Sequence, residues 1–160
     1  MLPFSSKKLK SYKVFLFKAN ASKVFAALPP LHEKAIQNTK CTDCAICCKS
    51  YSPTFNPTDR KRIAKHLQMK EKDFMIKYLV QDADGDYVTP TQPCAFLGED
   101  NNCSIYEYRP SDCVRFPYTN ENVLMKKPAI TLKNAAFCPI VQEVMDNLLE
   151  QFYPPKKPSN

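Results

Sequence analysis

The most regular hydrophobic pattern lies near the end of the chain, where apolar residues recur every three or four positions. These residues are Ile140, Val141, Val144, Met145, Leu148 and Leu149. This spacing places their side chains on one face of a helix. The pattern therefore predicts an amphipathic helix from about Pro139 to Phe152, followed by a disordered tail at 154–160.

The N-terminal pattern is less regular, because lysine and serine are mixed with aromatic residues over 1–28. The apolar residues that would share one face of an irregular helix, or of two short helices, are Phe15, Phe17, Val24, Phe25 and Leu28. Pro29-Pro30 should end any helix before it, because proline lacks a backbone N–H and restricts the residue that precedes it. A short helix over 31–39 would then lead to Cys41.

Capping and turn residues predict the structure of the middle of the chain. The segment Asn56-Pro57-Thr58-Asp59 is typical of a helix start, and this helix should run to about Leu67. A second helix is expected behind the acidic Glu71. The segment Asp84-Gly85-Asp86 predicts a turn, and a short strand at 87–89 should follow it.

Residues 90–128 are interrupted by proline and cysteine and show little periodicity. We expect irregular structure there, with one short helix started by Arg109-Pro110-Ser111. The predicted fold is mainly α, with irregular cysteine-rich segments and at most a short β element. A chain of 160 residues suits one small domain, which we expect metal to staple.

Charge divides the chain at about residue 40. Residues 1–40 carry eight Lys against Glu33 alone, whereas the rest carries 15 basic and 15 acidic residues, so the whole net charge of +7 lies in the first part. We therefore predict a basic N-terminal extension or helix at 1–40 and a cysteine-cluster metal-binding domain at 41–153. The extension would give at most a weak anionic partner, and the neutral remainder argues against a nucleic-acid module.

The eight cysteines are expected to be thiols in a reducing compartment. The first 30 residues are rich in lysine, and their longest apolar run is the four residues Val14-Phe15-Leu16-Phe17, which does not resemble a secretory signal. No stretch approaches the roughly 18 apolar residues of a membrane span. We therefore expect a cytoplasmic protein, in which grouped cysteines indicate metal more often than disulfides.

Four thiols lie within eight residues, in the pattern Cys41-x-x-Cys44-x-x-Cys47-Cys48. A C-x-x-C turn lets two sulfurs converge on one ion, and thiolate is the preferred ligand of zinc and of iron-sulfur clusters. Adjacent side chains should point apart, so Cys47 and Cys48 are expected to serve two nearby sites or to leave one spare thiol.

The other four cysteines, Cys94, Cys103, Cys113 and Cys138, are scattered, so the fold must bring them to the first group. Eight thiols allow two zinc sites with four ligands each. They also allow one cubane cluster on Cys41, Cys44 and Cys47, with Cys138-Pro139 as the remote fourth ligand. The spacing does not separate zinc from iron-sulfur, and it predicts no oligomeric state.

Four motifs in order, C-x-x-C-x-x-C-C, C-x-F-L, C-x-I-Y-x-x-R-P-x-x-C-x-x-F-P and C-P, cover roughly 40–144. They resemble the YkgJ-type cysteine-cluster family, described as a zinc- or iron-chelating domain. The resemblance implies metal chelation, and all eight cysteines occupy matching positions. Many members carry Arg directly after the cysteine where this chain has Val114 and then Arg115. A flagellin lysine methylase looks like a relative built around the same motif.

Arg109 and Arg115 are candidates to support the site from outside the ligand set, because guanidinium groups can donate to thiolate or sulfide. Surface pairing of Arg109 with Glu107 or Asp112 is an equally good interpretation. Tyr106 is expected to pack rather than react. We expect the same of Phe116, and neither of the two histidines is expected to bind metal.

Three functions remain open on the sequence. The first is a metal protein that folds with its metal and serves storage, delivery or sensing. The second is a cluster-dependent enzyme similar to the flagellin lysine methylase, although no acid–base pair is visible and we predict no catalytic residue. The third is a zinc-stapled nucleic-acid module, suggested by the basic extension.

Overall fold

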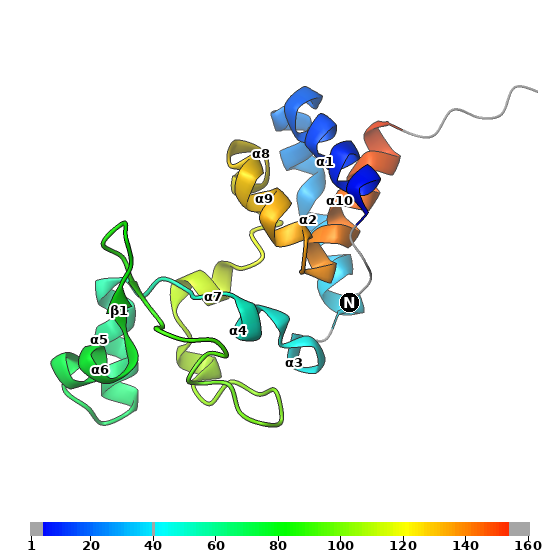
Figure 1. Cartoon of the computed structure of the whole chain (residues 1–160). Coiled ribbons are helices and arrows are strands. Elements are labelled where there is room, and N and C mark those ends of the chain that lie inside the picture. Colours follow the sequence, from blue (N-terminus) through cyan, green and yellow to red (C-terminus); the bar gives the residue numbers. More distant parts are fainter. Residues whose placement is uncertain (1–4, 40, 154–160) are drawn as a thin grey trace, which may run out of the picture. The chain divides into compact units, whose positions relative to one another are not determined.

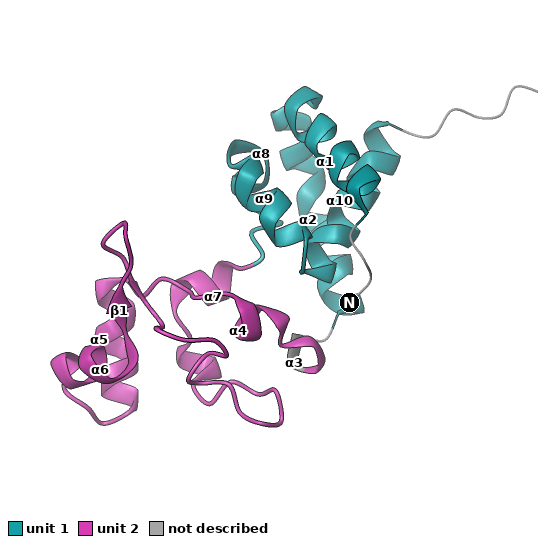
Figure 2. Ribbon diagram, in the orientation of Figure 1, with its two compact units in different colours: residues 1–40, 117–160 teal, residues 41–116 magenta. Residues whose placement is uncertain are grey.

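The computed structural model describes residues 5–39 and 41–153, without the side chains of Cys41 and Thr42, and the predicted tail at 154–160 lies outside them. The described chain is mainly helical with one short antiparallel ribbon, which confirms the predicted fold class (Figure 1). It divides into two compact units, unit 1 from residues 1–40 with 117–160 and unit 2 from residues 41–116 (Figure 2). Within the described ranges, no helix combines the length and apolar character that a membrane span requires.

Unit 1 is a group of helices in which the last one contacts three others. Its helices are α1 (Ser6–Lys18), α2 (Ala21–Asn38), α8 (Val123–Lys126), α9 (Pro128–Ala135) and α10 (Pro139–Phe152). The predicted C-terminal helix is thus confirmed, and α10 packs against α1, α2 and α9. Side-chain caps explain where the first two helices begin, since Ser5 accepts from the Lys8 N–H and Asn20 from the Lys23 N–H.

The first 40 residues contribute large buried side chains to unit 1. Three of the five apolar residues predicted to share a face, Phe15, Val24 and Leu28, are buried. The prediction was wrong for Phe17 and Phe25, which are 68% and 42% exposed. Phe17 lies two positions after the buried Phe15 in α1, and Phe25 directly follows the buried Val24 in α2, so neither shares the face of its buried neighbour.

Pro29-Pro30 does not end a helix, contrary to the prediction, because both lie inside α2. Each proline removes a backbone donor from the helix, which ordinarily breaks it. Here both prolines are exposed, while Val24 and Leu28 before them and Ala35 after them are buried. Packing of α2 against α8 and α10 therefore holds both halves in one helix.

Unit 2 contains the cysteine-rich part of the chain. Its elements are α3 (Cys41–Cys44), α4 (Ile46–Ser50), α5 (Pro57–His66), α6 (Glu71–Tyr78), β1 (Val80–Gln81), β2 (Tyr87–Val88), the 3-10 helix η1 (Tyr106–Tyr108) and α7 (Ser111–Arg115). Its core is aromatic and aliphatic, with Phe55, Ile63, Phe74, Phe96 and Ile105 buried together. This core fixes α5 and α6 beside the loops that carry the cysteines.

Most local predictions for unit 2 are confirmed. Asn56 accepts from the Asp59 N–H at 2.9 Å, and α5 ends at His66, one residue before the predicted end. The helix behind Glu71 is α6. The predicted strand is β2, and its partner β1, which the sequence did not indicate, pairs with it in antiparallel register.

Residues 90–138 hold more helix than predicted. The expected short helix is α7, but η1, α8 and α9 were not foreseen. In α9 the buried face includes polar Thr131 and Asn134, and the Thr131 hydroxyl donates to the Leu124 carbonyl at 2.8 Å. A buried face with polar residues shows no hydrophobic period, so the pattern could not reveal this helix.

Candidate metal centre

Cys94 and Cys103 lie on the two arms of one tight loop. An antiparallel bridge joins Leu97 to Cys103, and the Gly98 N–H donates to the Asn102 carbonyl at 2.8 Å. The loop is fastened to α4, because the Cys94 N–H donates to the Cys48 carbonyl at 2.8 Å. This arrangement joins three of the predicted ligands through the backbone.

The two sulfurs of this loop share the same local bonding. Each accepts a hydrogen bond from the backbone N–H two residues later, Phe96 for Cys94 and Ile105 for Cys103. Burial raises the pKa of both thiols, and these N–H donors partly oppose it, because they favour the charged thiolate. Donors aimed at sulfur stabilise the form that binds metal.

Cys47 and Cys48 lie closer together than predicted. Their sulfurs are 3.9 Å apart, so the expectation that adjacent side chains diverge was wrong. Two ligands of a tetrahedral site with metal–sulfur bonds of about 2.3 Å lie about 3.8 Å apart. Ala45 has a positive φ and separates α3 from α4, so the chain changes direction immediately before the helix that carries both thiols.

One of these two thiols is activated at the expense of the other. The hydrogen bond from Cys48 lowers the pKa of Cys47 to about 7. The same bond, together with burial, raises the pKa of Cys48. Cys47 is therefore the more acidic thiol of the pair and the better nucleophile near neutral pH.

Cys113 on α7 joins this group. Burial raises the pKa of its thiol, and the charges of Asp112 and of Cys94, Cys47 and Cys103 raise it further. The charges of Cys47, Cys113 and Cys94 likewise raise the pKa of Cys48. Five of the eight predicted ligands are therefore near enough for their thiolate charges to repel one another. A bound cation would relieve that repulsion.

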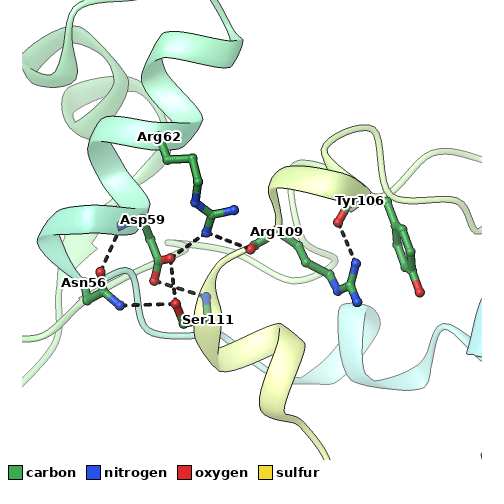
Figure 3. Close-up of polar contacts among 6 residues, drawn as sticks. All are labelled: Asn56, Asp59, Arg62, Tyr106, Arg109 and Ser111. Carbon is green, nitrogen blue, oxygen red and sulfur yellow. Dashed lines mark hydrogen bonds and ion pairs between the residues drawn. The ribbon is translucent and has the colours of Figure 1, made fainter.

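Asp59 fixes the start of the helix that carries Cys113 (Figure 3). Its carboxylate is 1% exposed and accepts from the Ser111 N–H at 3.1 Å and the Ser111 hydroxyl at 2.8 Å. Arg62 donates to the same carboxylate at 2.6 Å. The buried anion thus joins α5 to the N-terminus of α7.

The next residue ties α7 to the segment after α4. Asp112 accepts from the Tyr51 hydroxyl at 2.7 Å and from the Thr54 N–H at 3.0 Å. The Tyr51 ring also stacks on Phe116, with ring centroids 5.7 Å apart, so the predicted packing role of Phe116 is confirmed. Ser111 and Asp112 therefore tie the start of α7, two residues before Cys113 and one residue before it, to α5 and to the segment after α4.

Arg109 lies beside the cysteine group. Its guanidinium lies 3.9 Å from the centre of the Tyr106 ring and donates to the Tyr106 carbonyl at 2.7 Å (Figure 3). Its positive charge lowers the pKa of Cys103, opposing the effect of burial. Tyr106 is 47% exposed, so it packs on this arginine rather than in the core. Arg115, the other predicted supporting residue, is the last residue of α7 and is exposed.

This group does not include three of the predicted ligands. Cys44 ends α3 with a half-buried thiol, and the side chain of Cys41 lies outside the described residues. Cys138 is buried in unit 1, immediately before α10. Among the described side chains, no three Cys, His, Asp or Glu groups are already close enough together to hold one ion.

Neither histidine replaces a missing cysteine. His32 bonds to the Thr119 hydroxyl at 2.8 Å in unit 1, and burial lowers its pKa. His66 stacks on Tyr108. The described cysteines are free thiols. This chemistry fits zinc or an iron-sulfur cluster and is a poor match to magnesium or calcium.

A comparison with known families matches residues 40–139 to one family, CxxCxxCC, described as "Putative zinc- or iron-chelating domain". No curated protein and no solved structure matches the chain. The matched residues span the whole set of eight cysteines and more than half of the chain. The chain therefore belongs to the CxxCxxCC family of zinc- or iron-chelating domains.

Proposed function

We propose that the chain binds zinc or an iron-sulfur cluster through cysteine thiolates, with Cys47, Cys48, Cys94, Cys103 and Cys113 as the central ligand set. The observation that carries this proposal is that the Cys47 and Cys48 sulfurs lie 3.9 Å apart, while the Cys94 N–H donates to the Cys48 carbonyl at 2.8 Å. Sulfurs at that separation suit two ligands of one tetrahedral site with metal–sulfur bonds of about 2.3 Å. The remaining thiols, Cys41, Cys44 and Cys138, would complete the central site or form a second one.

This ligand set determines how many protons metal binding releases and what net charge the bound site carries. Burial keeps most of these thiols protonated in the metal-free protein, so binding a metal releases protons. Four thiolates around a divalent ion leave a net negative charge, and Arg109 would offset part of it beside Cys103. We propose that Arg115 supports the site in the same way.

The biological role that suits this chemistry is metal-dependent folding combined with storage, delivery or sensing of the metal, in a reducing cytoplasm. A bound metal would join α4, the 94–103 loop and α7, which are short elements separated in sequence. A cluster-dependent enzyme would use the same thiolates, so the experiment below tests the site that both functions require.

The experiment reconstitutes metal-free, reduced, full-length protein in parallel with zinc and with ferrous iron plus sulfide. We compare wild type with Cys47→Ser, Cys113→Ser and the control Lys49→Ala, which alters an exposed residue next to Cys48. Zinc is measured by competition with a chelating dye and the cluster by its visible absorption. The proposal predicts loss of tight binding in both cysteine variants and none in the control. Equal binding by all four proteins would contradict it.

A further inference from the structure

A second site candidate lies away from the thiols, on the exposed face of α5. A shallow pocket of about 670 Å³ is lined by Thr58, Lys61, Arg62, Lys65, His66 and Tyr108. Five of these residues come from α5, at spacings of three and four, and Tyr108 comes from η1. Among the described residues that line the pocket, none is acidic.

Two of the three Lys and Arg side chains of this face, Lys61 and Lys65, are not engaged by an acidic group of the described chain. Arg62 is already engaged, because it donates to Asp59 at 2.6 Å and to the Arg109 carbonyl at 3.1 Å (Figure 3). Lys61 and Lys65 have no ion-pair partner among the described residues. They lie one turn apart on one face, where like charges destabilise a helix. The pocket therefore presents two unneutralised ammonium groups to solvent.

An aromatic surface closes one side of the pocket. The rings of His66 and Tyr108 are stacked, with centroids 3.9 Å apart and planes inclined by 14°. Tyr108 is 39% exposed, and His66 is exposed as well. Stacked, partly exposed rings offer a flat π surface to another flat ring. The Thr58 hydroxyl adds a hydrogen-bond donor to the same pocket.

We propose that this pocket binds a mononucleotide, with its phosphate between Lys61 and Lys65 and its base on the His66–Tyr108 stack. A phosphate monoester carries a charge of about −1.5 to −2 at neutral pH, which matches the two ammonium groups. The volume falls within the range of about 300–1,000 Å³ that is typical of small-molecule sites. A nucleic-acid strand would need a basic groove that continues beyond one helix face.

The test measures binding of AMP, inorganic phosphate and adenosine to full-length protein, used as purified, by isothermal titration calorimetry at low salt. AMP should bind more tightly than phosphate, and adenosine should bind most weakly. Lys61→Ala and Lys65→Ala should each weaken AMP binding about tenfold, because each removes a charge-assisted bond to phosphate. Tyr108→Leu should weaken binding of AMP but leave binding of inorganic phosphate unchanged.

Lys72→Ala, on the exposed surface of α6, is the matched control and should bind AMP like wild type. A loss in Lys72→Ala equal to that in the pocket variants would show general charge attraction and overturn the proposal. So would tight binding of an oligothymidylate that depends on Lys61 and Lys65 while AMP binds no better than phosphate. None of these readouts depends on thiol ligation, so the proposed metal function would survive either failure.

Discussion

Replacing Asp59 by alanine should release Cys113 from its position without altering any thiol. The Asp59 carboxylate is 1% exposed and accepts two bonds from Ser111, the first residue of α7. Without it, the Ser111 N–H at the start of this helix loses its partner. Cys113 lies two residues further on, so its sulfur should sample more positions and hold a metal less well.

The magnitude follows from the bonds that are lost. Two hydrogen bonds to a buried carboxylate are worth about 1.5–3 kcal/mol each, so their loss should cost about 3–6 kcal/mol. The ion pair with Arg62 adds only about 0–1 kcal/mol, because the arginine side chain is 36% exposed. Domains of this size are stable by about 5–15 kcal/mol, so Asp59→Ala removes a large part of the total.

Ser111→Ala provides a milder form of the same perturbation. It removes the hydroxyl bond to Asp59 at 2.8 Å and the longer bond from the Asn56 amide at 3.4 Å, and should cost about 1.5–3 kcal/mol. The double variant should be little worse than Asp59→Ala, because both changes break the same contact. Asp86→Ala is the control, since Asp86 is exposed on the turn between β1 and β2.

The assay follows urea unfolding by circular dichroism and metal release to a chelating dye for the metal-loaded proteins. Asp59→Ala should release metal fastest, Ser111→Ala more slowly, and Asp86→Ala at the wild-type rate. If Asp59→Ala stays folded and both it and Ser111→Ala release metal like wild type, the carboxylate does not position Cys113 and the reasoning fails.

Three further outcomes are expected. In the metal-free protein at pH 7, iodoacetamide should modify Cys47 before Cys48, because the pKa of Cys47 is lowered to about 7. Peptide mass spectrometry measures the two rates, and equal rates would refute this assignment. Burial raises the pKa of the Cys94 and Cys113 thiols, so in the unfolded chain these thiols ionise at a lower pH than in the folded one. Reduced metal-free protein should therefore keep its stability below about pH 8.5 and lose it above that pH. A urea midpoint that is unchanged between about pH 7 and 10 would count against this expectation. Tyr12→Phe should lower the free energy of unfolding by about 1–3 kcal/mol, because it removes the hydroxyl bonds to Asp146 and to the Gln142 carbonyl. Its metal content should stay unchanged, and a parallel loss of metal would show that unit 1 supports the site.

The sequence predicted best those elements whose signals are local. The helix α5 begins with a capping Asn56 and Pro57, and α10 repeats apolar residues at helical spacing, so neither depends on distant contacts. The thiol pattern indicated sulfur-based metal chemistry for a similar reason, because the type of ligand atom depends only on which amino acid is present. Family membership then followed from the spacing of those cysteines.

Features set by tertiary packing were beyond the sequence. Pro29-Pro30 carries a strong local stop signal, but burial of α2 on both sides of it decides the outcome. The Cys47 and Cys48 sulfurs lie 3.9 Å apart within one helix, a separation that depends on side-chain conformations and not on the spacing of the residues. Asp59 looked like an ordinary first-turn acid, and only the fold shows that it is buried against Ser111.

The account rests on the metal, and elemental analysis of anaerobically purified full-length protein tests it most directly. Inductively coupled plasma mass spectrometry and the visible spectrum should be recorded for wild type and for a variant with Cys47, Cys94, Cys103 and Cys113 all replaced by serine. We predict at least one zinc per chain, or iron with sulfide and a brown colour, in wild type, and loss of that metal in the variant. Wild-type protein that stays free of zinc and iron after reconstitution, or a variant that retains the full metal content, would contradict the account.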